Sequence, residues 1–564
     1  MASKIMARIG ALALCLAVAA CTKSGPGAAG GGILNESPGA PAVSLPAQRV
    51  NSWTHPHVLR YTTTEDISGL NPALVQQGTV FYMAQMTMAW LIKFDEHNNP
   101  YPELATQVPT KANGGVSPDG LTITYHIRKG VKWSDGAPFD ADDVVWSFHA
   151  ILNPANNILS RTGWDRIKTI DEPDKYTVIV HLSKPYSPFL ETFFSTAGAN
   201  PSILPKHILA QYPNFNNVPY NALPIGIGPF KYKEWQRSQR VVMVANPLYF
   251  RGSPKLKEID FEIIPDTNTT VTELQAKQID LWYPVPASSF ATKLQSMSDF
   301  AYIRQPGYLF NHIDFNLTHP VLRDRAVREA LRYATDRATI IQKVSHGIGI
   351  LQEQPAPRTA PYWDPNIKPV PFDIAKANQI LDAAGWKRGA DGIRTKNGMR
   401  LSLVVVTNTG NPAADTQIEM LRDWWKQIGA EITVKHYSTA LIFAPYADHG
   451  VLYRGNWDAI FFAWGVDAIG DLSTIYACDA IPPNGQNVLH WCNPAADKAM
   501  HDFYTHYDQA QRNKDDAVLF EQLVKDVPTI VTNGREDLYV FNRDLKNFHP
   551  NGVSPFDNMM NVDI

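Results

Sequence analysis

The chain has 564 residues, in which 51 lysines and arginines nearly balance 54 aspartates and glutamates, for a net charge of −3. The length permits more than one domain of ordinary size. The near-neutral charge, with no long run of one sign, argues against a nucleic-acid-binding surface. The sequence has no Gly-x-Ser-x-Gly elbow, no His-Glu-x-x-His pair and no phosphate-binding glycine loop, so we expect a protein that is not an enzyme.

The N-terminus has the features of an export signal. Lys4 and Arg8 precede an apolar run over residues 9–20, which is too short for the roughly 20 residues of a membrane span. We therefore predict a signal peptide over residues 1–20. The small residues before Cys21 resemble a bacterial lipobox, which implies that Cys21 becomes the lipidated N-terminus; the alternative is an ordinary secretory signal with an incidental cysteine. Gly, Ala, Pro and Ser dominate residues 21–56, a composition typical of a flexible tether.

Two cysteines, Cys478 and Cys492, lie beyond this N-terminal region. In an exported protein such a pair predicts a disulfide, closing a loop of about 15 residues worth roughly 3 kcal/mol. A metal site that adds His490 and His501 is the alternative, but the spacing matches no standard zinc pattern. We expect neither a metal nor a cofactor.

In the body of the chain, strand and helix patterns alternate. Residues 121–127 alternate apolar and polar side chains, which predicts a half-buried strand. Asp140 is expected to cap a helix from about Ala141 to near Pro154, with Asp143 reaching back to the cap. Further amphipathic helices are predicted over the segments 323–345, 374–385 and 416–428, and a strand over 431–436. This alternation indicates a mixed α/β architecture.

One stretch resembles a known family signature. It consists of Ser117-Pro118-Asp119-Gly120-Leu121, Arg128-Lys129-Gly130-Val131-Lys132-Trp133-Ser134-Asp135-Gly136 and Phe139-Asp140-Ala141-Asp142-Asp143-Val144. The chain thereby resembles the bacterial extracellular solute-binding proteins of family 5, the peptide, dipeptide and nickel binding subunits of ABC importers. The matches continue in family order at Gly226-Ile227-Gly228-Pro229-Phe230, Asn246-Pro247, Val327-Arg328-Glu329-Ala330-Leu331 and Ala383-Ala384-Gly385-Trp386. The resemblance covers nearly everything from about Val58 to Asn558.

The resemblance implies an α/β fold of the two-lobed periplasmic-binding-protein type (type II, flytrap), with an extra subdomain in the first lobe. Lobe I would take residues 57–306, including an inserted subdomain over about 101–222. Lobe II would take residues 307–535, and residues 536–564 would return to lobe I. Such lobes close over a ligand by a hinge motion.

The same resemblance implies a ligand-binding residue in lobe II. A peptide's ammonium group loses water when the lobes close, so a carboxylate must meet it. In the peptide-binding branch this carboxylate belongs to a Trp-x-x-Asp motif, which corresponds here to Asp467, with Trp464 and Gly465 beside it. The alternative is that Asp467 only caps a turn before a helix at Leu472. A disulfide after the motif, as predicted here, is a feature of peptide-binding members.

Further ligand contacts are expected in lobe I and at the first crossing between the lobes. Glu65 and Asp66, in a loop that matches the family's first ligand-facing turn, would add negative charge near the amino end; the alternative is a solvated acidic turn. Tyr308 would face the cleft or pack in the hinge. The loop at residues 411–415 lacks the arginine with which dipeptide binders clamp the far carboxylate. This departure favours a longer peptide over a strict dipeptide.

These observations predict a monomeric, lipid-anchored binding protein on the periplasmic or cell-surface side of a bacterial membrane. It would capture peptides and deliver them to an ABC permease and ATPase complex. Two alternatives remain open: the same fold binding a metal chelate, haem or oligosaccharide, and a lipoprotein that senses peptides without transporting them.

Overall fold

The computed structural model describes residues 51–564, apart from residues 76, 96, 159, 160, 162, 198, 199 and 445. The predicted signal peptide and Cys21, the predicted site of lipidation, lie outside the described residues. Asn51 and Thr54, within the segment predicted as tether, both donate hydrogen bonds to the Asp544 carboxylate. These two residues therefore belong to the folded body. Within the described part of the chain, no helix is long and apolar enough to cross a membrane.

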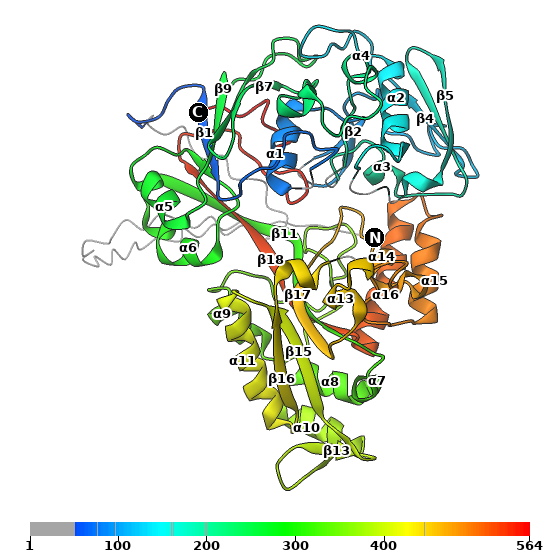
Figure 1. The fold of residues 1–564 in the computed structure, drawn as a ribbon, viewed down its shortest axis with the longest axis vertical. Coiled ribbons are helices and arrows are strands. Elements are labelled where there is room, and N and C mark those ends of the chain that lie inside the picture. Colours follow the sequence, from blue (N-terminus) through cyan, green and yellow to red (C-terminus); the bar gives the residue numbers. More distant parts are fainter. Residues whose placement is uncertain are drawn as a thin grey trace, which may run out of the picture.

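One ten-stranded mixed sheet runs through both lobes (Figure 1). From the edge in lobe II to the edge in lobe I, the strands are β16 (Glu431–Tyr437), β15 (Ser402–Asn408), β17 (Ala459–Gly465), β11 (Phe300–Phe315), β18 (Thr529–Asn542), β10 (Leu281–Trp282), β1 (Val58–Thr63), β9 (Glu258–Ile263), β8 (Arg240–Ala245) and β7 (Phe230–Gln236). Parallel pairs join β1 to β9 and β10, and β15 to β16 and β17. The neighbouring strands β11 and β18, fourth and fifth in this order, are antiparallel.

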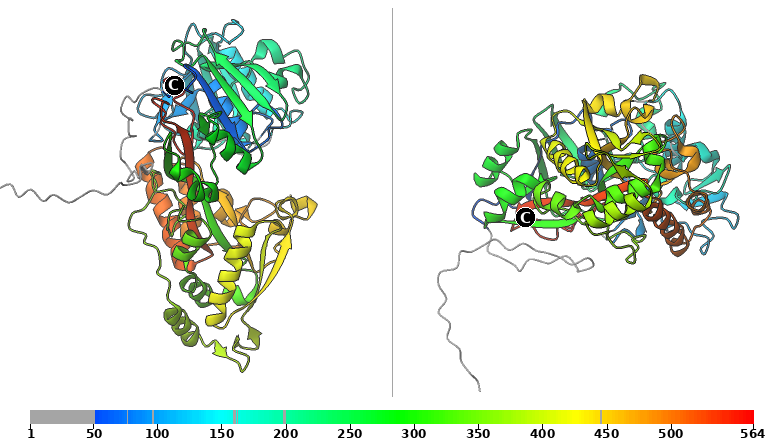
Figure 2. Two further views of the ribbon diagram at one scale, coloured as in Figure 1. Left: turned by 90° about the vertical axis from the view of Figure 1, so that its left-hand side faces the viewer. Right: turned by 90° about the horizontal axis from the view of Figure 1, so that it is seen from below.

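The strands β11 and β18 connect the lobes. They have 16 and 14 residues and pair along almost their whole length, from Phe300 opposite Asn542 to Asp314 opposite Thr529. The register shifts between Pro306 and Phe310, which is where the pair passes from one lobe to the other. Both strands run as a continuous ribbon between the lobes in the side view (Figure 2).

Three small sheets and a set of helices complete the fold. The small sheets are β4 (Thr122–His126), β6 (Thr177–Leu182) and β5 (Ile167–Asp174); β2 (Ile92–Phe94) and β3 (Pro100–Pro102); and β12 (Lys387–Arg388), β13 (Arg394–Lys396) and β14 (Met399–Arg400). The lobe I helices are α1 (Gly78–Thr87), α2 (Ala141–Leu152), α3 (Phe189–Thr192), α4 (Lys206–Leu209), α5 (Thr267–Gln275) and α6 (Ala287–Thr292). The lobe II helices are α7 (Pro320–Arg323), α8 (Arg325–Tyr333), α9 (Arg337–Lys343), α10 (Ile374–Ala383), α11 (Pro412–Gln427), α12 (Thr439–Ile442), α13 (Val451–Arg454), α14 (Ser473–Tyr476), α15 (Pro494–Phe503) and α16 (Gln509–Asp526).

Two of the apolar cores lie on opposite sides of the crossing between the lobes. One core joins residues between Leu59 and Ala301 to C-terminal residues between Tyr539 and Ile564. Another consists entirely of residues between Ile313 and Ile530. The C-terminal segment therefore packs with β1 and α1.

Most predicted elements are present, with one clear error. The strand at residues 121–127 is β4, and α2 begins at Ala141 with the Asp140 side chain accepting from the Asp142 amide. The prediction of one helix over residues 323–345 is wrong, because the segment contains α8 and α9 as separate helices. Asp336 separates α8 from α9, because its side chain accepts from the Thr339 amide and caps the start of α9.

The two lobes touch beside the α15–α16 turn. The Tyr507 hydroxyl donates to the Gly120 carbonyl at 2.8 Å and accepts from the Tyr186 amide at 3.0 Å. The Ser187 amide donates to the Tyr504 carbonyl at 2.8 Å, and the rings of Tyr186 and Tyr504 stack. Figure 1 shows α3 of lobe I directly above α15 and α16. The structure thus describes an arrangement in which the lobes are in contact.

The predicted disulfide between Cys478 and Cys492 is present. It ties the segment after α14 to the start of α15, where Asn493 caps the helix by accepting from the Ala495 and Ala496 amides. The Cys478 amide also donates to the Asp497 side chain at 2.7 Å. Because the two sulfurs are bonded to each other, neither is a thiolate ligand for the alternative metal site.

We predict that removing this bridge destabilises lobe II without preventing folding. A double Cys478→Ser, Cys492→Ser variant should lose roughly 2–4 kcal/mol of unfolding free energy, because the unfolded chain gains the entropy of the opened loop. Urea denaturation of the variant and of the oxidised and reduced wild type measures this loss. The reduced wild type serves as the matched control and should unfold with the variant; equal stability of all three forms would contradict the prediction.

Candidate functional site

The end of β17 sets the position of Asp467. The strands β11 and β17 pair antiparallel, with Leu309 opposite Gly465, and the Val466 amide donates to the Tyr308 carbonyl at 2.8 Å. The strand pair ends at the crossing between the lobes. Asp467 follows immediately, so the ladder itself places this carboxylate beside the crossing.

The Asp467 carboxylate is held by a tight turn. Its Oδ1 accepts from the backbone amides of Ile469, Gly470 and Asp471, at 3.2, 2.6 and 3.1 Å. The turn cap that the sequence offered as the alternative role is therefore present, and it uses one of the two carboxylate oxygens. Among the described residues, the other oxygen, Oδ2, has no hydrogen-bond partner. The side chain is consequently fixed in orientation while one oxygen stays available.

Gly470 is required by this turn. Its φ of +92° lies in the left-handed region, and a Cβ there would come within 3.0 Å of Asp516 Oδ2 and of the Tyr362 ring. The Tyr362 hydroxyl in turn donates to the Asp467 carbonyl at 2.6 Å. A side chain at position 470 would displace the groups that surround Asp467.

Asp467 belongs to a group of four carboxylates, which we call the acidic cluster: Glu191, Asp467, Asp471 and Asp516. Glu191 comes from α3 of lobe I, whereas Asp516 comes from α16 of lobe II; they are 7% and 3% exposed. Glu191 Oε2 and Asp516 Oδ2 are buried without a hydrogen-bond partner. Asp471 is bonded to Ser473 and to Tyr504. The cluster therefore brings acids from both lobes together.

Positive charge near the cluster is scarce. Burial raises the pKa of Glu191 to about 8, Arg512 opposes this shift, and Asp467 adds to it. Burial and the Asp471 charge raise the pKa of Asp467 to about 7, although the three amides favour its ionised form. The Arg512 guanidinium donates to the His506 carbonyl and the Gln509 side chain, and forms no ion pair with a described carboxylate. A cation that enters this site would relieve the repulsion.

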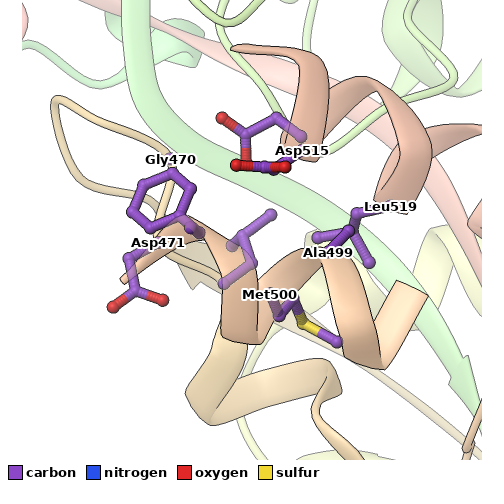
Figure 3. A pocket seen from close by; sticks show the side chains of 9 residues that line it. Gly470, Asp471, Ala499, Met500, Asp515 and Leu519 are labelled. Atoms are coloured by element: carbon purple, nitrogen blue, oxygen red, sulfur yellow. The ribbon is translucent and has the colours of Figure 1, made fainter. Parts of the chain in front are cut away.

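A small cavity adjoins the cluster between the Gly470–Asp471 turn, α15 and α16 (Figure 3). Figure 3 shows the side chains of Asp471, Met500, Asp515 and Leu519 around it. Its volume of about 10 Å³ corresponds to about one water molecule. This cavity is too small for a peptide, so it is a packing gap beside Asp516 and not the ligand space.

Trp464 lies on β17 just before Asp467, and Tyr308 lies close enough to Asp467 to be affected by its charge. The Trp464 ring contacts Phe462 edge to face and lies parallel to the His312 ring, and its indole nitrogen is buried without a partner. The Tyr308 hydroxyl accepts from the Asn98 side chain at 2.6 Å. Burial raises the pKa of Tyr308, and the Asp467 charge raises it further. Tyr308 therefore packs in the crossing and also lies near Asp467.

Glu65 and Asp66 have mainly structural contacts. Glu65 accepts from the Thr79 amide and hydroxyl at the start of α1, whose cap residue Gln77 provides no capping side chain. Asp66 accepts from the Ser238 hydroxyl at 2.7 Å. Both residues are exposed, and among the described residues neither of them contacts Asp467. The structure thus does not bring these two predicted residues to the acidic cluster.

Sequence reasoning did not single out Glu191 or Asp516. Glu191 stands in an apolar run, between Phe189 and Phe193, where an acid is unusual. That position within a hydrophobic stretch was the available signal. Asp516 has no such signal, because it follows another aspartate on a polar helix.

Comparisons with known proteins agree with this architecture. Residues 99–481 match the family model described as bacterial extracellular solute-binding proteins, family 5 Middle. The oligopeptide-binding protein AppA of Bacillus subtilis is 29% identical over 452 residues, covering 78% of this chain and 80% of that protein. The nickel-binding periplasmic protein of Escherichia coli is 27% identical over 405 residues, covering 70% and 74%. The structure of Bacillus subtilis AppA in complex with a nonapeptide superimposes with a TM-score of 0.71 at 25% identity, covering 90% of this chain and 98% of that one.

We predict that the buried Glu191 makes the protein less stable as the pH rises. Its pKa of about 8 exceeds the ordinary value of 4.5, so between these values the folded state holds a proton that the unfolded chain releases. The unfolding free energy should fall through this window, by on the order of 4 kcal/mol from this residue. Urea denaturation at pH 5 and pH 8 measures the fall.

Two variants isolate the contribution of Glu191. Glu191→Gln should reduce the pH dependence, whereas Glu521→Gln, on the exposed side of α16, should leave it as in the wild type. An equally steep pH dependence in Glu191→Gln and wild type would show that Glu191 does not hold the proton.

Proposed function

Because this chain belongs to the bacterial extracellular solute-binding proteins of family 5, we propose that it captures peptides between its lobes for an ABC importer. The ligand would bind with its ammonium group at Asp467. The permease and ATPase of the importer would then receive it from the closed protein.

The observation that carries the proposal is the uncompensated charge around Asp467. Its Oδ2 has no partner among the described residues, and two further acids of the cluster have buried oxygens without partners. Burying carboxylates without a counterion costs several kcal/mol, and burying an ammonium group without a counterion is unfavourable for the same reason. A primary amine of the ligand at Asp467 would pair the two opposite charges and reduce both costs. An anionic ligand would meet repulsion at the same place.

The loop that would face the far end of the ligand also bears on the ligand's length. The loop before α11 has no cationic side chain, and its Asn411 accepts from the Ala414 amide as the helix cap. Pro412 takes the first helical position, where its missing amide hydrogen costs nothing. This loop serves the helix and offers no clamp for a carboxylate. The proposal is therefore an oligopeptide in preference to a strict dipeptide.

The contacts between the lobes support closure over a ligand. We propose that lobe I comprises residues 57–306, with the inserted subdomain over about 101–222, that lobe II comprises 307–535, and that 536–564 return to lobe I. The strands β11 and β18 would act as the hinge. The hydrogen bonds of Tyr507 and Ser187 between the lobes would then exist only in the closed form, beside the acidic cluster. Ligand would stabilise closure by neutralising acids contributed by both lobes.

A metal chelate is the second candidate, favoured by the similarity to a nickel-binding protein. The negative charge of the cluster favours a cationic ligand over an anionic chelate. Haem, an oligosaccharide and a purely sensory role have no comparable support from the site.

The export signal belongs to the same proposal: the protein would be anchored by lipid at Cys21 on the outer side of a bacterial membrane, as a monomer. In cells, the wild type should stay with the membrane fraction after a salt wash, and Cys21→Ala should move to the soluble fraction, since the acyl chains supply the attachment. Cys15→Ala, within the predicted signal peptide, is the matched control and should behave as wild type. Retention of Cys21→Ala in the membrane would contradict the anchor.

The amine contact is tested by pairing a substitution with a ligand modification. Asp467→Asn keeps an acceptor for the three turn amides but removes the charge. Losing one partner of a buried charge pair costs roughly 3–5 kcal/mol, so binding of the tetrapeptide Ala-Lys-Ala-Ala should weaken a few hundredfold or more. Acetylating the peptide's amino group should weaken wild-type binding by a similar factor and affect Asp467→Asn little, because both changes remove the same interaction.

Calorimetry of the four combinations provides the measurement. Asp423→Asn, on the exposed side of α11, should bind as wild type does. If acetylation leaves wild-type affinity unchanged, Asp467 does not bind an ammonium group, and a ligand other than a peptide becomes the better proposal.

A further inference from the structure

A second carboxylate lies at the crossing between the lobes. Asp537 of β18 faces Gly307 of β11, and a Cβ at Gly307 would lie 3.0–3.1 Å from the two oxygens and the carboxyl carbon of Asp537. The carboxylate therefore covers the glycine backbone, in space that any other residue would fill. Asp537 is partly exposed, and neither of its oxygens has a hydrogen bond or ion pair among the described residues.

Three tyrosines lie near this carboxylate. Tyr283 and Tyr539 stack with ring centroids 4.1 Å apart, and the hydroxyls of Tyr82 and Tyr283 are 3.2 Å apart. After burial, the Asp537 charge is the largest cause that raises the pKa of Tyr283 and of Tyr539, and it also raises that of Tyr82. Tyr283 and Tyr539 are buried and Tyr82 is half-buried, so the Asp537 charge lies beside a packed group of aromatic rings.

Among the described residues, no side chain forms an ion pair with this carboxylate. Arg535 lies on the same face of β18, where it is exposed, and its charge acts on Asp537 without direct contact. Arg304 is already paired with Glu536 at 2.6 Å. Glu65 adds negative charge, since it raises the pKa of Tyr82 and Tyr61. Burial raises the pKa of Asp537 to about 7, although the Arg535 charge opposes this rise.

The position of Asp537 relates it to Asp467. The residue after Gly307, Tyr308, accepts the Val466 amide, and Asp467 follows Val466. This path between the two residues covers no more than about three residue lengths, on the order of 10 Å. A peptide whose ammonium group lies at Asp467 would bring the side chain of its first or second residue near Asp537.

We propose that Asp537, with Tyr82, Tyr283 and Tyr539, is a second cation-binding subsite that selects peptides with Lys or Arg at the first or second position. The carboxylate supplies the counter-charge, and the tyrosine rings add cation–π attraction, which is strongest where water is excluded. The chain thereby prefers ligands with two positive groups, one at each carboxylate. This inference rests on the proposed peptide-binding function and specifies its substrate class.

The test compares a charged and a neutral side chain of equal length. Calorimetry measures the affinities of Ala-Lys-Ala-Ala and Ala-norleucine-Ala-Ala, and of the two matching peptides with Lys or norleucine first. The wild type should prefer Lys in at least one pair by about tenfold or more. Asp537→Asn should abolish this preference while leaving the affinity for the norleucine peptide within about twofold.

Two further variants guard against an indirect effect. Asp260→Asn changes another partly exposed carboxylate of the same sheet, in β9, and should retain the preference for Lys. Gly307→Ala keeps all charges but pushes a methyl group against the Asp537 carboxylate, and should reduce the preference. It also tests the subsite if Asp537→Asn does not fold, as judged by its thermal unfolding.

The outcomes separate this inference from the proposed function. If the wild type binds Lys and norleucine peptides equally, or if Asp537→Asn and Gly307→Ala retain the preference, the subsite is wrong. A strong effect of amino-terminal acetylation in that case would leave the proposed function intact. If the wild type binds none of the four peptides, both proposals fail.

Discussion

The antiparallel ladder between β11 and β18 is the interaction on which the rest of the structure depends. It lies inside the large sheet, between β17 and β10, and it continues from lobe I into lobe II with a register shift at the crossing. The crossing carries Gly307 and Tyr308 on one strand and Asp537 on the other. Through β17, the same ladder positions Asp467. If these strands act as the hinge, a change in their bending also moves the residues of the ligand site that they carry.

Electrostatics at the interface between the lobes gives this hinge its proposed sensitivity to ligand. Glu191 and Asp516 approach Asp467 from opposite lobes, and burial disfavours the charged form of all three. Without a cation the acids must hold protons or repel each other, and either alternative costs free energy in the closed form. An ammonium group would convert the repulsion into attraction. The contacts of Tyr507 and Ser187 next to the cluster would then form at a lower cost in free energy.

Local sequence patterns predicted much of the fold, because the interactions that start a helix or form a strand involve residues close together in the sequence. The start of α2 at Ala141 follows from the capping side chain of Asp140, and β4 follows from alternation of apolar residues. The helix predicted over residues 323–345 fails for a local reason as well, because the Asp336 cap outweighs a continuous apolar periodicity. Helix starts depend on caps that are visible in the sequence. The sequence does not show which of two competing local signals prevails.

The sequence by itself determined the family resemblance, the two-lobed α/β class, the cysteine pair and the motif that ends in Asp467. It also showed that Asp467 was suited to both a turn and a ligand. Only the tertiary structure decided that one oxygen serves the turn and the other stays available. Likewise, Glu191, Asp516 and Asp537 are ordinary acids in the sequence, separated by hundreds of residues or placed on different elements. Their removal from water, nearly complete for Glu191 and Asp516 and partial for Asp537, arises from packing between distant segments, which no local pattern encodes.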